Sequence, residues 1–158
     1  MFFIDKYAPK TAKDSKIHKE ILKLLEFISK DDSIPHIIFY GNDGVGKRRI
    51  IKLFLEMLYG SEVNNMEDNT YVVSGSGNKI RDVVVKQSDF HIMIEPVDNN
   101  FDKYLIQDIV KEYAKRIQIN IFKSKKIFKS VMINNLDNLS YYAQTSLRRT
   151  MEKYSGTC

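Results

Sequence analysis

A glycine-rich loop followed by a lysine is the stretch of this chain with the clearest chemistry. The spacing of Gly41, Gly46 and Lys47 fits the GxxxxGK form of a phosphate-binding loop, which joins a buried strand to a helix. Glycines let the backbone turn so that several N–H groups point at one anion, and the following helix adds its positive N-terminal end. The lysine can then reach the outer phosphates of a nucleotide. The alternative is a glycine-rich turn that only joins strand to helix.

The loop departs from the usual pattern at one position. A serine or threonine normally follows the lysine and holds Mg²⁺ through its hydroxyl, but here the residue is Arg48. A second cation therefore stands where the metal ion would bind, which favours weak binding of ATP or ADP with little dependence on Mg²⁺. The candidate nucleotide-binding residues are Gly41, Asn42, Asp43, Gly44, Val45, Gly46, Lys47 and Arg48.

The second half of a nucleotide site is also altered. An acidic residue at the end of a second buried strand usually orients Mg²⁺, and a carboxylate often serves as general base. The strand expected at 130–133 is followed instead by Asn134 and Asn135, whose amides neither accept a proton from water nor suit a hard dication. Asp137 is the nearest acid, beyond the positions that would point at the metal. The alternative is that 130–137 is merely a strand and a turn.

Apolar periodicity and turn residues predict the elements that must position these groups. Helices are expected from about 15 to 28, from 47 to 60, from about 103 to 117, and after a capping Ser140. Strands are expected at 37–40, 71–73, 82–86, 90–95 and 130–133. Strands separated by helices indicate a three-layer α/β domain with a mostly parallel sheet.

Composition limits the class of protein. A chain of 158 residues with 43% hydrophobic and 28% charged residues is one domain or part of one. It has neither an apolar run long enough to span a bilayer nor a signal-peptide core, so no membrane partner is expected. The only cysteine is Cys158, which indicates a reducing compartment. The three histidines are far apart, and we expect no metal site.

The net charge of +5 permits contact with nucleic acid but does not require it. Several basic residues cluster late in the chain and would form either a phosphate-binding patch or a solvated helix face and loop. These residues are Lys111, Lys115, Arg116, Lys123, Lys125, Lys126 and Lys129.

Three segments resemble replication factor C small subunits, the AAA+ components of the clamp loader. They are Tyr-Ala-Pro-Lys at 7–10, Pro-His-Ile-Ile-Phe-Tyr-Gly at 35–41 and Leu-Arg-Arg-Thr-Met-Glu-Lys-Tyr at 147–154. The chain looks most like the subunit 3/5 type, whose ATPase motifs are degenerate. That type has a basic residue after the loop lysine and segments similar to 90–98 and 106–108.

The resemblance implies that 1–158 is a partial AAA+ domain, a RecA-like P-loop NTPase fold. In the family, the sensor-1 strand, the arginine-finger motif, the helical lid and the collar all lie after the position of Cys158. The expected sensor-1 strand would lie between the strands at 37–40 and 130–133. We therefore expect the isolated chain, as the first half of such a subunit, to be partly molten, because the central strands would leave backbone groups unpaired.

The resemblance also implies a function. Such a subunit helps load the sliding clamp onto primer–template DNA in replication and repair, beside other clamp-loader subunits, in the nucleus or another site of DNA replication. Its nucleotide site is expected to bind without efficient hydrolysis, with Tyr7 nearby, although Ala8 replaces the usual arginine. Lys103 becomes a candidate contact to DNA phosphate, the alternative being a solvated lysine. Arg148 and Arg149 become candidate subunit-interface residues.

Two other functions stay open from the sequence. One is an active P-loop ATPase that uses a relocated acid such as Asp137 or Asp98. The other is a non-functional remnant of a clamp-loader subunit, which would not assemble with its partners. Turnover measured with and without Mg²⁺ separates the first from a non-hydrolysing subunit, and co-purification separates the second.

Overall fold

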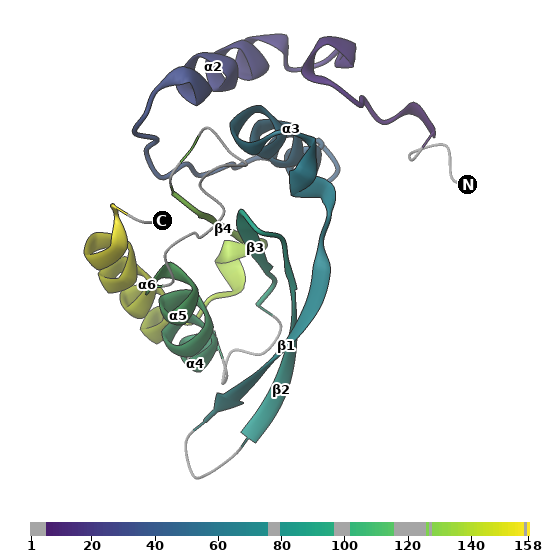
Figure 1. Ribbon diagram of the computed structural model, residues 1–158. Coiled ribbons are helices and arrows are strands. Elements are labelled where there is room, and N and C mark those ends of the chain that lie inside the picture. Colours follow the sequence, from purple (N-terminus) through teal and green to yellow (C-terminus); the bar gives the residue numbers. More distant parts are fainter. Residues whose placement is uncertain (1–5, 76–79, 97–101, 116–125, 127, 157) are drawn as a thin grey trace. The chain divides into compact units, whose positions relative to one another are not determined.

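The computed structural model describes residues 6–75, 80–96, 102–115, 126, 128–156 and 158 (Figure 1). The chain forms two compact units, Met1–Glu62 and Val63–Cys158. Among the described residues, no helix is long and apolar enough to cross a membrane.

The first unit is helical. A 3-10 turn, η1 at Ala12–Asp14, precedes helix α2 at Lys19–Lys30 and helix α3 at Lys47–Tyr59. The 3-10 turn η2 at Ser61–Asn64 contains the boundary between the two units. The predicted α3 is confirmed, and it ends at Gly60, whose φ of +86° an L side chain rarely adopts. Helix α2 begins later than the predicted 15, because His18 has a φ of +60° that interrupts the helical backbone. Buried leucines of α2 and α3 form this unit's core: Leu22, Leu25, Leu53, Leu55 and Leu58.

The strand predicted at 37–40 is wrong: none of the four strands of the described sheet includes these residues. Ile38 is 74% exposed and Tyr40 is 93% exposed. A strand needs a neighbour that takes up its backbone N–H and C=O groups, and no described strand pairs with this segment. The apolar run therefore has the composition of a strand but lacks a neighbouring strand, which its own sequence cannot supply.

The second unit contains a four-stranded sheet of order β1-β2-β3-β4. The strands are β1 at Glu67–Ser74, β2 at Ile80–Gln87, β3 at His91–Ile94 and β4 at Ser130–Ile133. β1 and β2 pair antiparallel, as do β2 and β3, whereas β3 and β4 are parallel, with His91 opposite Ser130 and Ile94 opposite Ile133. The four strands predicted in this region are therefore confirmed, with longer bounds for β1 and β2 and shorter bounds for β3.

The prediction of a mostly parallel sheet is wrong for these strands, since the described sheet is mixed. The reason is the length of the connections. Only a few residues separate β1 from β2 and β2 from β3, and so short a link can only reverse the chain. The long stretch between β3 and β4 contains a helix and permits the parallel crossover. Much of the predicted turn between β1 and β2, residues 76–79, lies outside the described residues.

The crossover helix runs continuously through α4 at Asp102–Tyr104, a π-helical segment at Leu105–Val110 and α5 at Lys111–Lys115. The helix predicted from about 103 is confirmed as far as Lys115, and residues 116 and 117 lie outside the described residues. A π-helical segment is unusual and is often found near functional sites. Here four of its residues are buried: Leu105, Ile106, Ile109 and Val110.

Helix α6 at Tyr141–Tyr154 follows β4 and the 3-10 turn η5 at Leu136–Asn138. Ser140 caps it as predicted, because the Ser140 Oγ accepts a hydrogen bond of 3.3 Å from the Ala143 N–H. One core joins one face of the sheet to the crossover helix and α6 (Figure 1), and its most buried members include Val73, Ile92, Ile94, Ile106 and Ala143. The unit is therefore α/β. Of the predicted three-layer domain, its described residues form the sheet and one layer of helices.

Candidate functional site

The phosphate-binding loop in the first unit has the backbone that its glycines predict. The φ angles of Gly41, Gly44 and Gly46 are +148°, +79° and +91°, values that L side chains rarely adopt. Gly46 is the N-cap residue of α3, so the chain passes directly from the loop into the positive end of a helix of thirteen residues. This geometry is suited to an anion.

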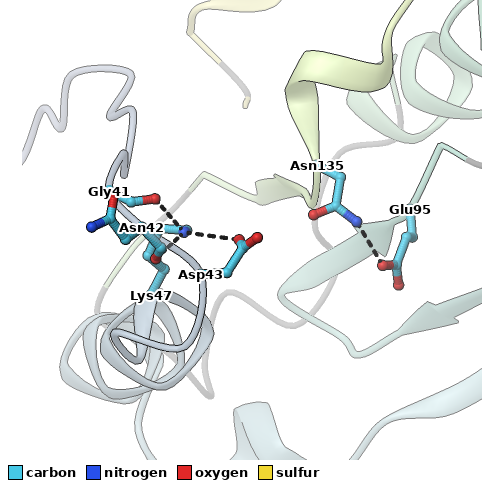
Figure 2. Close-up of polar contacts among 6 residues, drawn as sticks. All are labelled: Gly41, Asn42, Asp43, Lys47, Glu95 and Asn135. Carbon is cyan, nitrogen blue, oxygen red and sulfur yellow. Dashed lines mark hydrogen bonds and ion pairs between the residues drawn. The ribbon is translucent and has the colours of Figure 1, made fainter.

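The ammonium group of Lys47 lies against the carbonyl groups of its own loop. Its Nζ donates hydrogen bonds of 2.7 Å to the Gly41 carbonyl oxygen and 2.9 Å to the Asn42 carbonyl oxygen (Figure 2). The Asp43 Oδ1 lies 3.8 Å from the same nitrogen, with the Asp43 side chain fully exposed. A phosphate would therefore compete with three oxygen atoms of the loop for this cation.

The first turn of α3 presents two further cations. Arg48, which replaces the metal-binding hydroxyl, is exposed. Arg49 donates from its Nη2 to the Pro9 carbonyl oxygen, which ties the N-terminal segment to the helix that carries the loop. The sequence analysis missed Arg49, although the run of three basic residues from Lys47 was a signal. Tyr7, two residues before Pro9, is 69% exposed, with the Lys6 Nζ 5.5 Å from its ring centroid.

In the second unit, the ends of β3 and β4 bring together the amides that replace the expected acids. Asn134 is 5% exposed, and its backbone N–H donates to the Ile94 carbonyl oxygen at 2.9 Å. Asn135 has a φ of +50°, a left-handed conformation that asparagine tolerates better than most residues. The turn requirement by itself thus favours an asparagine at 135, in keeping with the alternative that 130–137 serves as strand and turn.

Glu95 is the carboxylate that the sequence analysis did not select. The Asn135 Nδ2 donates a hydrogen bond of 3.0 Å to the Glu95 Oε1, across the ends of the parallel pair β3 and β4 (Figure 2). Both side chains are exposed. The signal was available, since carboxyl ends of parallel strands share one sheet edge. Asp137 is exposed on η5, and Asp98 lies outside the described residues.

The remaining candidates lie elsewhere in the second unit. Lys103 is only half-buried, and its Nζ lies 5.9 Å from the Tyr104 ring centroid and 6.0 Å from that of Tyr142. Arg148 and Arg149 are exposed on α6, where the Arg148 Nε lies 3.0 Å from the Glu152 Oε1. Among the described residues, no group of three or more acids, histidines or cysteines could hold a metal ion.

The late basic cluster is only partly a solvated face. Lys126 and Lys129 are each 8% exposed, and the Lys129 Nζ lies 4.8 Å from the Tyr113 ring centroid. Burial raises the pKa of the neighbouring Cys158 thiol to about 11, an effect that the charge of Lys129 partly opposes. Arg116, Lys123 and Lys125 lie outside the described residues.

Comparison with known proteins gives a consistent family relationship, although no family model matches the chain. The chain is 41% identical over 158 residues to a replication factor C small subunit of Acanthamoeba polyphaga mimivirus, covering all of this chain and 42% of that protein. It is 36% identical over 162 residues to replication factor C subunit 5 of Oryza sativa subsp. japonica, covering all of this chain and 46% of the relative.

A human relative extends the same pattern. The chain is 32% identical over 157 residues to replication factor C subunit 3 of Homo sapiens, covering 99% of this chain and 44% of the human protein. The chain therefore spans less than half the length of the curated relatives that it matches.

Proposed function

Because this chain is homologous over its whole length to the replication factor C small subunits, we propose that it acts as a clamp-loader subunit in DNA replication. The observation that carries the proposal is that the sequence similarity extends over the whole chain and so includes both the phosphate-binding loop and the β3–β4 sheet edge. Its partners would be other clamp-loader subunits, the sliding clamp and primer–template DNA, at the site of replication.

Co-purification with the other clamp-loader subunits tests this proposal. We expect the chain to be recovered with them and expect the charge reversals Arg148→Glu and Arg149→Glu to weaken recovery. The ion pair of Arg148 with Glu152 is exposed and contributes little to stability, so these variants should still fold. Lys153→Glu, further along α6, is the matched control. Failure of the unaltered chain to assemble would support a non-functional remnant instead.

We further propose that the phosphate-binding loop binds ATP or ADP weakly and with little dependence on Mg²⁺. The glycine conformations and the start of α3 support anion binding. Weak nucleotide binding is supported by Lys47, which already donates hydrogen bonds to the Gly41 and Asn42 carbonyl oxygens. Binding with little dependence on Mg²⁺ is supported by Arg48, which replaces the hydroxyl that would hold the metal ion.

Calorimetry with and without Mg²⁺ provides the test of the loop. Lys47→Ala should abolish nucleotide binding, because it removes the cation that reaches the outer phosphates. Lys52→Ala, which removes an exposed lysine later on α3, should leave binding unchanged. Strongly Mg²⁺-dependent binding would contradict the assigned role of Arg48.

Hydrolysis is the point on which the competing ATPase hypothesis differs. Asn134 and Asn135 support a non-hydrolysing site, since neither amide can act as general base. Glu95 is the described acid that best supports the alternative, because it lies at the same sheet edge as Asn135. We expect no turnover above background. Turnover that is removed by both Lys47→Ala and Glu95→Gln would establish the ATPase hypothesis.

A further inference from the structure

The ammonium group of Lys47 lies close to three oxygen atoms of its own phosphate-binding loop (Figure 2). An ammonium group has three N–H donors. Two of them donate to carbonyl oxygens, at 2.7 Å for Gly41 and 2.9 Å for Asn42. The third oxygen is the Asp43 Oδ1, 3.8 Å from the Lys47 Nζ, which is too far for a hydrogen bond but close enough for an ion pair. The cation that would bind phosphate is therefore already in contact with its own loop.

Asp43 differs from the two carbonyl groups in charge and in freedom of movement. The carbonyl oxygens are neutral and belong to the backbone of the loop. The Asp43 carboxylate carries a negative charge on a fully exposed side chain, whereas the side chain of Lys47 is only 31% exposed. Because water surrounds it, the carboxylate can rotate away from Lys47 without any change in the backbone. Of the three oxygen atoms, it is the one that an incoming phosphate displaces most easily.

The charge of Asp43 opposes phosphate binding in two ways. While it is paired with Lys47, it lowers the positive potential that attracts a phosphate. After displacement it remains attached to the loop, a few ångströms from the bound phosphate, and the two negative charges repel each other. Each effect is modest because the carboxylate is in water, where exposed ion pairs are weak. Together they lower the affinity of the loop without blocking it.

We propose that Asp43 is an intramolecular competitor of the nucleotide phosphates and the residue that sets the affinity of the phosphate-binding loop. The inference rests on the proposed binding of ATP or ADP by this loop, and it names the side chain that keeps this binding weak. The rival role for Asp43 is that of a metal ligand, since carboxylates in nucleotide sites orient Mg²⁺. The 3.8 Å separation from the Lys47 ammonium favours competition.

Calorimetry on the full 158-residue chain, with and without Mg²⁺, provides the test. The probes are ADP and inorganic pyrophosphate, and the second shows whether the effect concerns the phosphates alone. Asp43→Asn should bind both probes about fivefold more tightly in both conditions, because it removes the charge and keeps the size of the side chain. Asp43→Ala should show the same gain. Asp43→Glu should bind like the unaltered chain, since it keeps the charge.

Glu26→Gln is the matched control. The Glu26 Oε1 lies 3.6 Å from the Lys30 Nζ, and this exposed acid also precedes its lysine by four residues, but on α2 instead of in the loop. The control changes the net charge of the chain as Asp43→Asn does, and it should leave both affinities unaltered. The affinity of Asp43→Asn should also fall more steeply with salt, because Lys47 then lacks a neighbouring negative charge and the attraction that salt screens is larger.

Four results would overturn the inference. They are an unchanged affinity in Asp43→Asn, an equal gain in Glu26→Gln, a loss of affinity in Asp43→Asn that appears only with Mg²⁺, and no binding of either probe by the unaltered chain and by Asp43→Asn. The third result would make Asp43 a metal ligand. Failure of the proposed clamp-loader role is separate, because it would appear as a chain that binds both probes as expected but is not recovered with other clamp-loader subunits.

Discussion

The two compact units hold their candidate residues by different means. In the first unit, the phosphate-binding loop takes its form from three glycine conformations and from the bonds of Lys47 to the loop's own carbonyls. In the second unit, Asn134 directly follows β4 and Lys103 lies in the first turn of the crossover helix, and both elements contribute to one hydrophobic core. One site is shaped locally, and the other depends on the packing of strands and helices.

Two apolar runs show what this difference means. Residues 37–40 and Ser130–Ile133 both have the composition of a buried strand. The second pairs with β3 along its whole length, whereas Ile38 and Tyr40 of the first are 74% and 93% exposed. Composition therefore makes a segment able to form a strand, but a neighbouring strand is needed to realise it.

The largest expected effect comes from the same substitution made in both units. Ile92→Ala should lower the free energy of unfolding by about 2–5 kcal/mol, because Ile92 is fully buried in the core of the second unit. Ile38→Ala should change it by less than about 0.5 kcal/mol. Urea unfolding followed by far-ultraviolet circular dichroism measures both, and a transition without cooperativity would instead support the partly molten state expected of the isolated chain. A large effect at Ile38 would show that 37–40 is packed after all.

Hydrogen exchange compares the backbones of the two apolar runs directly. The Ser130 N–H bonds the Phe90 carbonyl oxygen at 3.0 Å, and the Asn134 N–H bonds the Ile94 carbonyl oxygen at 2.9 Å. These amides should exchange at least roughly a hundredfold more slowly than those of 37–40, relative to their random-coil rates. Strong protection of 37–40 would mean that this segment pairs in solution, and the contrast between the units would disappear.

The smallest effects concern how the two long helices begin. Ser140→Ala should lower the free energy of unfolding by about 1 kcal/mol, because it removes the Oγ that accepts a hydrogen bond from the Ala143 N–H. Ser140→Gly should cost only a few tenths of that value. Gly46→Ala should cost about 1–2 kcal/mol for a different reason, the φ of +91° at the N-cap of α3. Thermal melts rank the three, and equal losses for Ser140→Ala and Ser140→Gly would contradict the capping role.

Much of the fold was predictable because its signals are local. Gly46 and Gly60 bracket α3, and Ser140 caps α6, as the sequence indicates. The hydrogen bond between Glu95 and Asn135 was not predicted, and neither was the contact of Lys103 with Tyr142. Each joins residues about forty positions apart, and local patterns carry no information about which distant elements will meet.

The sequence by itself determined most of the elements, the glycine backbone of the phosphate-binding loop and the absence of a hydroxyl or an acid at Arg48, Asn134 and Asn135. These are properties of single residues and of their near neighbours. Only the tertiary structure decided that the sheet is mixed, that 37–40 stays unpaired in the described sheet, and that the Lys103 ammonium lies 6.0 Å from the Tyr142 ring centroid. The physical reason is that strand pairing and side-chain contact satisfy groups far apart in the chain, so their outcome depends on which surfaces come together.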